Sequence, residues 1–323
     1  MKLWQYVLKR VLQGIPLTVA IIVICFVIIR LAPGDPINML VSGYEPPPEM
    51  RRQLEAYWGL DKPLHQQLIV YIGRVLAGNL GYSHLAGKTV LEAIYERMPA
   101  TLLLMLTGLV FSSIIGVGAG VMSSRRPYSL ADNILTGTSL IGYSVPLFWV
   151  GQILIITLAL GLKLFPVSGM FSLRQELTGM ACFLDVLWHL VLPAVTLSVW
   201  FLALVTRITR AKMMEVLRQD FIIMARAKGA TESRVTWRHA LRNALSPIVT
   251  VIGFECGGIF MGAVVTETVF GWPGMGRLMY DSIMSRDYPV VTGLFFLISV
   301  TVIGVNIIVD IIYSILDPRI RYT

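Results

Sequence analysis

Long apolar runs, each enough to cross a lipid bilayer, divide this chain of 323 residues. A helix rises about 1.5 Å per residue, so about 20 apolar residues span roughly 30 Å of hydrocarbon. Charge-free runs of this size cover residues 11–29, 98–124, 133–162, 186–206 and 290–309. A sixth run, residues 243–266, is interrupted only by Glu255. The pattern predicts an all-α integral membrane protein with six transmembrane helices.

Composition supports this class. The chain is 55% hydrophobic and 14% charged, and its mean hydropathy is +0.71. A soluble protein of this length cannot bury so much apolar surface, which excludes that class. The first apolar run is too long for the core of a cleaved signal, and Arg30-Leu-Ala-Pro33 is a poor cleavage site. We therefore expect the first span to be retained.

The run from Asn133 to Leu162 is the least regular of the six. It would be about 45 Å long if wholly helical, and it contains Pro146. Proline removes a backbone donor and clashes with the preceding turn. It could break the run into an interfacial piece and a span, or kink one long helix. The distribution of charge argues against two full spans.

Basic residues fix the expected orientation. Six crossings with the N-terminus inside place Arg125, Arg126 and both chain ends in the cytoplasm. The inside segments then carry a net charge of +10 and the outside segments −1. This asymmetry follows the positive-inside rule. The overall charge of +8 therefore reflects topology, and we expect no nucleic-acid partner.

Residues 207–246 form the most basic stretch, with nine Lys or Arg against three acids. A segment this basic between two spans is expected to lie in the cytoplasm and to dock on a partner there. Its pattern predicts a helix over residues 213–227, with Met214, Val216 or Leu217, Phe221 and Met224 on one side.

Two residues mark the boundaries inside this stretch. Gly229 is expected to end the first helix, and Thr231 to cap a second helix whose first turn carries Glu232. The alternative is a solvated basic hairpin held by lipid head groups. The apolar residues 221–224 argue against it, because they would expose too much apolar surface.

Residues 32–97 form a long segment that the topology places outside. Residues 49–58 and 64–76 show the three-and-four spacing of short amphipathic helices. The segment is interpreted either as a folded cap or as a docking surface for an external partner.

Glu255 is the one acid within a predicted span, and it lies well inside that span. An ionised acid at mid-bilayer is costly, so it should face the bundle interior or water. Glu255 and the helix break at Pro146 are therefore candidate pathway residues. Glu255 could equally form a hydrogen bond to a neighbouring helix.

No arrangement of residues indicates catalysis. The three cysteines and four histidines are scattered, without metal-ligand spacing. The sequence from Gly81 to Thr89 has five residues between its glycines where a phosphate-binding loop needs four. We expect no catalytic, metal-binding or cofactor-binding residues in this chain, so a transporter built on it must take energy from a partner or a gradient.

Nine short motifs occur in order along the chain. They are Leu31-Ala-Pro-Gly-Asp-Pro36, Gly59-Leu-Asp-Lys-Pro-Leu64, Gly78-Asn-Leu-Gly81, Glu96-Arg-Met-Pro-Ala-Thr101, Ala225-Arg-Ala-Lys-Gly229, His239-Ala-Leu-Arg-Asn-Ala-Leu245, Glu267-Thr-Val-Phe-Gly-Trp-Pro-Gly274, Arg286-Asp-Tyr-Pro289 and Asp317-Pro-Arg-Ile-Arg321. Together they resemble one family, the permease subunits of binding-protein-dependent ABC importers of the dipeptide, oligopeptide and nickel type. The long outside segment is similar to that of the first permease of the pair.

The resemblance implies the ABC type I importer permease fold in a bacterial inner (plasma) membrane. It implies a second related permease subunit, two ATP-binding subunits that hold ATP and Mg, and an external solute-binding protein. The chain would then divide into a cytoplasmic N-terminus with the first span (1–31), an external segment (32–97) and a five-helix core (98–323) with its coupling segment at about 207–246.

The resemblance also implies which residues couple to the ATP-binding subunit: Met224, Ala225, Arg226, Ala227, Lys228, Gly229 and Ala230. The general permease motif begins Glu-Ala-Ala where this chain has Ile223-Met-Ala225, which is similar to the peptide-type variant. Asn79 replaces a frequent aspartate, with unknown consequence. The segment Glu267 to Gly274 either shapes the external mouth or is an ordinary tight loop.

The expected function is a non-catalytic permease that forms, with its partner permease, the path for dipeptides or oligopeptides. The same machinery could import nickel, a nickel chelate or glutathione. A secondary transporter independent of ATP is the alternative from another class, although no internal repeat is evident. A membrane enzyme or a receptor component is a further alternative.

Overall fold

The computed structural model describes residues 3–31, 46–58, 61–83, 86–172 and 177–316. The side chains of residues 254–259 and of some other helical positions also lie outside the description. Contacts divide the chain into two compact units, residues 1–99 with 277–307 and residues 100–276 with 308–323. The division into span, external segment and core stays a prediction.

Among the residues that the structure describes, four helices are long and apolar enough to cross a membrane. They are α1 (Leu3–Leu31), α5 (Val90–Arg125), α8 (Met180–Val216) and α13 (Tyr288–Leu316). A bent pair makes a fifth if it is one span, and α11 (Leu241–Phe270) has 30 residues. The predicted all-α membrane class is confirmed. The count of six spans and the cytoplasmic ends remain predictions.

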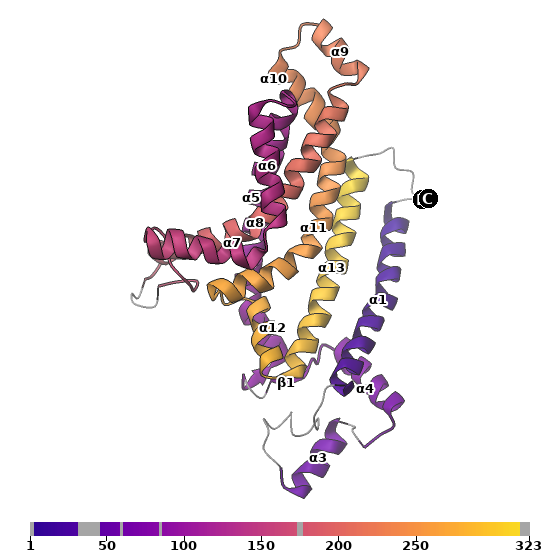
Figure 1. Ribbon diagram of the computed structural model, residues 1–323. Coiled ribbons are helices and arrows are strands. Elements are labelled where there is room, and N and C mark those ends of the chain that lie inside the picture. The colour runs from indigo at the N-terminus through magenta and orange to yellow at the C-terminus, as the bar shows by residue number, and fades with distance from the viewer. Residues whose placement is uncertain (1–2, 32–45, 59–60, 84–85, 173–176, 317–323) are drawn as a thin grey trace. The chain divides into compact units, whose positions relative to one another are not determined.

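The bent pair is the run that contains Pro146. Helix α6 (Leu130–Ser144) ends with Val145 in an extended conformation, and Pro146 begins α7 (Leu147–Leu154), which continues as η1 (Ile155–Gly161). The two parts meet at 106°, so that α7 runs across the direction of α6 (Figure 1). The proline breaks the run sharply, because its ring excludes the helical hydrogen bond at this point.

The first unit contains the two predicted amphipathic helices, α3 (Pro48–Trp58) and α4 (Leu64–Leu76). Helix α4 packs on α1, where the rings of Phe26 and Tyr71 lie 5.7 Å apart. Strands β1 (Tyr82–Ser83) and β2 (Lys88–Thr89) pair antiparallel, with Tyr82 opposite Thr89.

One buried contact fixes this hairpin. The Ser83 hydroxyl donates to the carboxylate of Asp287. Asp287 lies in the short connection between α12 (Met275–Met284) and α13. Within residues 32–97, helix α4 and this hairpin thus pack against other elements of the first unit, and the cap interpretation stays a prediction. Docking of an external partner on this segment also stays a prediction.

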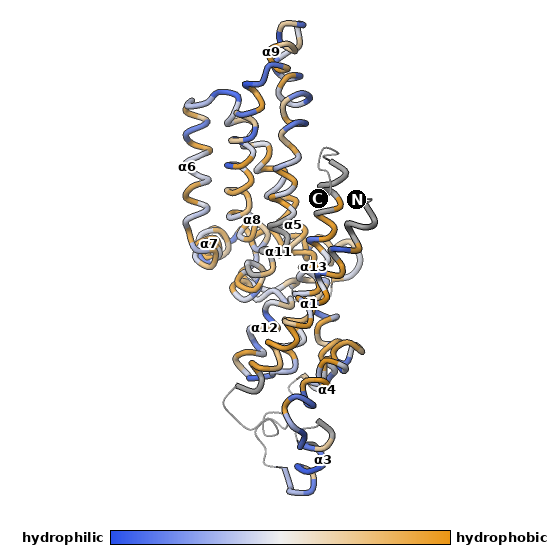
Figure 2. The backbone as a smooth tube through the Cα atoms, turned by 90° about the vertical axis from the view of Figure 1, so that its right-hand side faces the viewer, coloured by the Kyte–Doolittle hydropathy of each residue, from blue (hydrophilic) through white to orange (hydrophobic). Residues whose placement is uncertain are grey.

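Helix α8 lies at the centre of the second unit and packs against α6 and α11. Glycines bring α5 close to it. A Cβ atom added to Gly120 would lie 2.5 Å from the Thr209 Cβ, and one added to Gly116 would lie 2.9 Å from the Val205 Cβ. Such close approach suits helices in lipid, where packing replaces the hydrophobic driving force. Figure 2 shows hydrophobic positions along these helices and hydrophilic ones towards α9.

Candidate functional site

The basic stretch folds as a compact element at the end of α8. It comprises α9 (Asp220–Ala227), α10 (Glu232–Arg234) and η2 (Val235–Ala240), which leads into α11. We call residues 220–234 the coupling turn. The predicted single helix over residues 213–227 is wrong, because α8 ends at Val216 and α9 starts anew at Asp220.

An apolar cluster beneath the coupling turn explains this break. Its buried members are Val121, Met213, Val216, Ile222, Val235, Ala240, Ala244 and Ile248. Ile222 is fully buried in it, whereas Met224 is 60% exposed. The predicted apolar side, which included Met214 and Met224, is therefore wrong. The break reorients α9, so that Ile222 joins a cluster with residues of α5 and η2. The spacing of apolar residues in a single continuous helix would place a different set of side chains on the buried face.

Gly229 ends α9, as predicted, and its backbone explains why. Its φ angle is +79°, in the region that L-residues with a Cβ disfavour. The Ala230 N–H donates to the Ala225 carbonyl, and the Gly229 N–H donates to that of Arg226. These two bonds form the Schellman motif. A Cβ on Gly229 would meet nothing within 4 Å, so the requirement for glycine is conformational rather than steric.

The second half of the coupling turn begins at a capped helix. The Thr231 hydroxyl accepts a hydrogen bond from the Arg234 N–H, which confirms the predicted cap. The Arg226 Nε lies 2.8 Å from Glu232 Oε1. The hydrogen bonds from Arg226 hold the pKa of Glu232 below its usual range. The ion pair thus connects the two helices across the glycine.

The seven predicted coupling residues differ in whether they pack inward or are exposed. Ala225 and Ala230 pack towards the apolar cluster, and Arg226 is held by Glu232. Met224, Ala227, Lys228 and Gly229 are exposed. The sequence interpretation missed Ile223, which is 57% exposed. The available signal was the apolar run 221–224, whose apolar surface indicated a docking segment. An apolar and basic tip on a fixed turn is suited to insertion into a partner.

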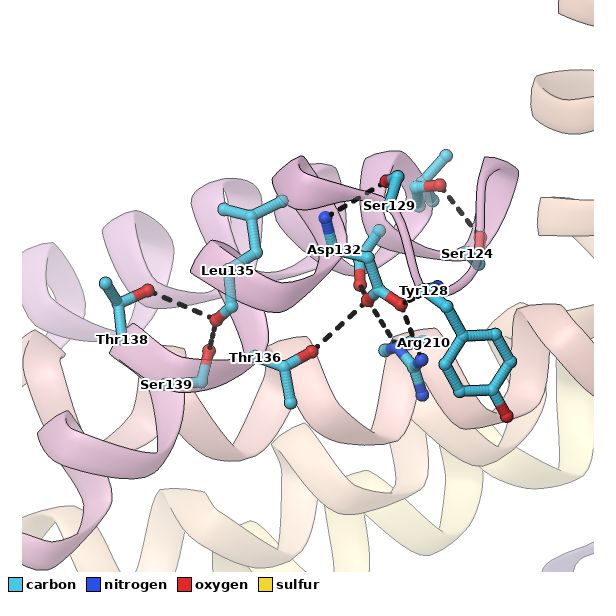
Figure 3. Close-up of polar contacts among 11 residues, drawn as sticks. Ser124, Tyr128, Ser129, Asp132, Leu135, Thr136, Thr138, Ser139 and Arg210 are labelled. Carbon is cyan, nitrogen blue, oxygen red and sulfur yellow. Dashed lines mark hydrogen bonds and ion pairs between the residues drawn. The ribbon is translucent and has the colours of Figure 1, made fainter.

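The start of α6 is joined to the end of α8 by a buried ion pair (Figure 3). The Arg210 Nε and one terminal nitrogen each lie 2.7 Å from an oxygen of Asp132. Asp132 is 1% exposed. The Ser123 hydroxyl and the Tyr128 N–H also donate to its carboxylate. A bidentate pair with further donors has a single well-defined geometry.

This ion pair was not predicted. Its partners are 78 residues apart, and neither belongs to a motif quoted above. The local signal was Ser129, whose hydroxyl accepts from the Asp132 N–H at the start of α6. Helix α8 continues from Arg210 to Val216, so the pair lies close to the coupling turn along the chain.

Another buried carboxylate lies near the C-terminal end of α11. Glu267 is fully buried, and its Oε1 accepts a 2.6 Å hydrogen bond from Thr101. The same Thr101 oxygen accepts from the Met275 N–H. The Trp272 indole donates to the Ala100 carbonyl. The segment from Glu267 to Gly274 is thus a packed turn, and its role at an external mouth stays a prediction.

The candidate pathway residues are less fully defined. Pro146 lies at the helix break, whereas the Glu255 side chain lies outside the described residues. Among the described residues no group of three His, Cys, Asp or Glu side chains could hold a metal ion.

Two family matches cover nearly the whole chain. Residues 115–322 match the family described as "Binding-protein-dependent transport system inner membrane component". Residues 3–105 match the corresponding N-terminal family of the membrane component.

Known relatives are similar over the same length. A di/tripeptide transport system permease protein of Pseudomonas aeruginosa is 40% identical over 98% of this chain and 99% of its own. The dipeptide permease of Escherichia coli K12 and an oligopeptide permease of Bacillus subtilis are 39% and 41% identical, with the same coverage.

A solved structure of the MetNI methionine ABC transporter, titled as inward facing, shares the fold. Its TM-score is 0.54 at 17% identity, over 70% of this chain and 97% of the other. The sequence matches and the fold agree with the helical membrane architecture found here. The chain belongs to the family of inner membrane components of binding-protein-dependent transport systems.

Proposed function

We propose that this chain is a permease subunit of an ATP-driven importer. With a second, related permease it would form the path for dipeptides or oligopeptides across the inner membrane. The observation that carries the proposal is the coupling turn, a capped and mostly exposed element whose tip presents Ile223, Met224 and Lys228. The names of the relatives support peptides as the solute.

In this mechanism the tip inserts into a cleft of an ATP-binding subunit, which holds ATP and Mg. A displacement of the tip passes into α8 and α11, because the buried cluster joins Met213 of α8 to Ala244 and Ile248 of α11. Packed helices move as bodies rather than deforming continuously. ATP-driven closure of two such subunits would therefore swing the spans, and an external binding protein would deliver the solute.

The alternatives make different demands. A secondary transporter needs a gradient but no ATP-binding subunit. Import of nickel, a nickel chelate or glutathione would use the same machinery with another binding protein. Among the described residues no metal-ligand cluster favours nickel, and the relatives reported above carry peptide names.

Uptake of a labelled dipeptide by the complete complex in proteoliposomes tests the proposal. We expect uptake to require both ATP on the side of the ATP-binding subunits and the external binding protein. Uptake that continues without ATP and follows an ion gradient would establish the secondary transporter instead. ATP-dependent uptake of nickel or glutathione without uptake of dipeptide would contradict the assigned solute.

A further inference from the structure

An exposed cation lies against aromatic rings on one face of the second unit. The guanidinium carbon of Arg207 lies 5.7 Å from the ring centre of Tyr143. The Tyr143 ring stacks on Trp200, with centres 5.4 Å apart and planes at 17°. Tyr143 belongs to the last turn of α6, just before the break at Pro146, and the other two residues belong to α8.

The Arg207 side chain extends along α8 from its own turn towards the two rings. Arg207 follows Trp200 by seven residues, or about 10 Å along the helix. Helical side chains lean towards the start of their helix, and the face of an aromatic ring attracts a cation. Arg207 and Tyr143 are both exposed in this unit. A charged side chain within a membrane usually faces the bundle interior or water and marks a solute path.

Arg207 differs from Arg210 in that its N–H donors are available to a ligand. Arg210, one turn later, is held by Asp132 on two oxygens. Among the described residues no acidic side chain lies within 4.0 Å of Arg207. An arginine against an aromatic ring keeps its planar fork of N–H donors available, and that fork matches a carboxylate.

We propose that Tyr143, Trp200 and Arg207 form a site on the solute path that binds the terminal carboxylate of a peptide. This inference rests on the proposed function, because it assumes that the path carries peptides. The aromatic pair fixes the position of the cation, and the side chains of the peptide face open space. Such a site recognises the terminal carboxylate, which all free peptides share, and does not discriminate between peptide sequences.

The first test measures whether the face is wet and positive. The complete complex is prepared in detergent without nucleotide, with the native cysteines replaced and Leu204→Cys introduced. Leu204 lies between Trp200 and Arg207 on the same helix face. Its labelling by a sulfonate methanethiosulfonate reagent is compared with labelling by the trimethylammonium reagent.

We expect the anionic reagent to be favoured by roughly tenfold relative to the same pair in an Arg207→Gln background. Arg126→Gln, which removes the same charge from the exposed loop between α5 and α6, is the matched control and should leave the ratio unchanged. Absence of labelling, or an unchanged ratio in Arg207→Gln, would overturn the proposal.

The second test uses trialanine and trialanine amide as probes. Trialanine should slow labelling of Leu204→Cys, whereas the amide, which lacks the carboxylate, should not, and Arg207→Gln should abolish the difference. Equal protection by both probes, or by neither, overturns the carboxylate site. Neither labelling test requires transport, so failure of ATP-driven uptake in the proteoliposome assay counts against the proposed function alone.

Discussion

Arg210 and Asp132 face each other across two helices, with both nitrogen–oxygen distances of their bidentate contact at 2.7 Å. Asp132 belongs to the first turn of α6 and Arg210 to the end of α8. The two helices are thereby fixed near the point at which α8 leads into the coupling turn. A displacement of the turn must move the start of α6 together with the end of α8.

Asp132→Ala should destabilise the permease, because it leaves Arg210 without its partner. Removal of one member of a buried pair costs about 3–5 kcal/mol. The lower end is expected here, since the Arg210 side chain is 23% exposed. A fall of roughly 6–10 °C in melting temperature should result, measured on the purified complex.

The exposed pair Lys212 and Glu215 provides the control, since their side chains are 41% and 61% exposed. Glu215→Ala should leave the melting temperature unchanged. The double variant of Asp132 and Arg210 should lose less than the two single losses added together. Additive losses would show that the pair does not act as a unit.

Gly229→Ala should disturb the coupling turn through its backbone. The left-handed conformation costs about 1–2 kcal/mol for an L-residue with a Cβ. We expect reduced solute-stimulated ATP hydrolysis and weaker co-purification of the ATP-binding subunit. Gly229→Asn should retain more activity, because asparagine tolerates this conformation better.

Gly137 is the matched glycine for this comparison. It lies within α6, and an added Cβ would also meet nothing within 4 Å. Gly137→Ala should therefore leave ATP hydrolysis unchanged. Equal activity of Gly229→Ala and Gly137→Ala would contradict the role given to the turn.

Two neighbouring isoleucines should separate folding from docking. Ile222 is fully buried and Ile223 is 57% exposed. Ile222→Ala should cost about 2–5 kcal/mol of stability and lower the melting temperature. Ile223→Ala should leave the melting temperature unchanged and weaken binding of the ATP-binding subunit, measured by titration. The reverse pattern would refute the orientation of α9.

Thr101→Val should destabilise the turn that follows α11. The hydroxyl both donates to Glu267 and accepts from the Met275 N–H, so valine leaves two buried polar groups without this partner. An unsatisfied buried group costs about 1–3 kcal/mol. Thr107→Val is the control, because the Thr107 hydroxyl bonds only to the Leu103 carbonyl of its own helix among the contacts described. Equal melting temperatures of the two variants would be the contradicting result.

Features with a local signal could be predicted from the sequence. The helices at 48–58 and 64–76 follow their apolar spacing. Gly229 ends α9 because glycine adopts its positive φ angle without strain. Thr231 caps α10 because its side chain accepts a hydrogen bond from the backbone N–H of Arg234, three residues later. Each of these effects acts within a few residues.

Features decided by distant contacts could not be predicted. No glycine or proline marks the break between α8 and α9 at residues 217–219. It depends on the burial of Ile222 with Val121, from another helix. Likewise the Asp132–Arg210 pair requires the α6–α8 packing, which periodicity does not specify.

We expect the tip of the coupling turn to bind an ATP-binding subunit. A photo-cross-linking amino acid introduced at Met224 tests it most directly in the complete complex, with position 137 on α6 as the control site. We expect a cross-link to the ATP-binding subunit from position 224 and none from position 137. A complex that hydrolyses ATP and imports solute but gives no cross-link from position 224 would contradict it.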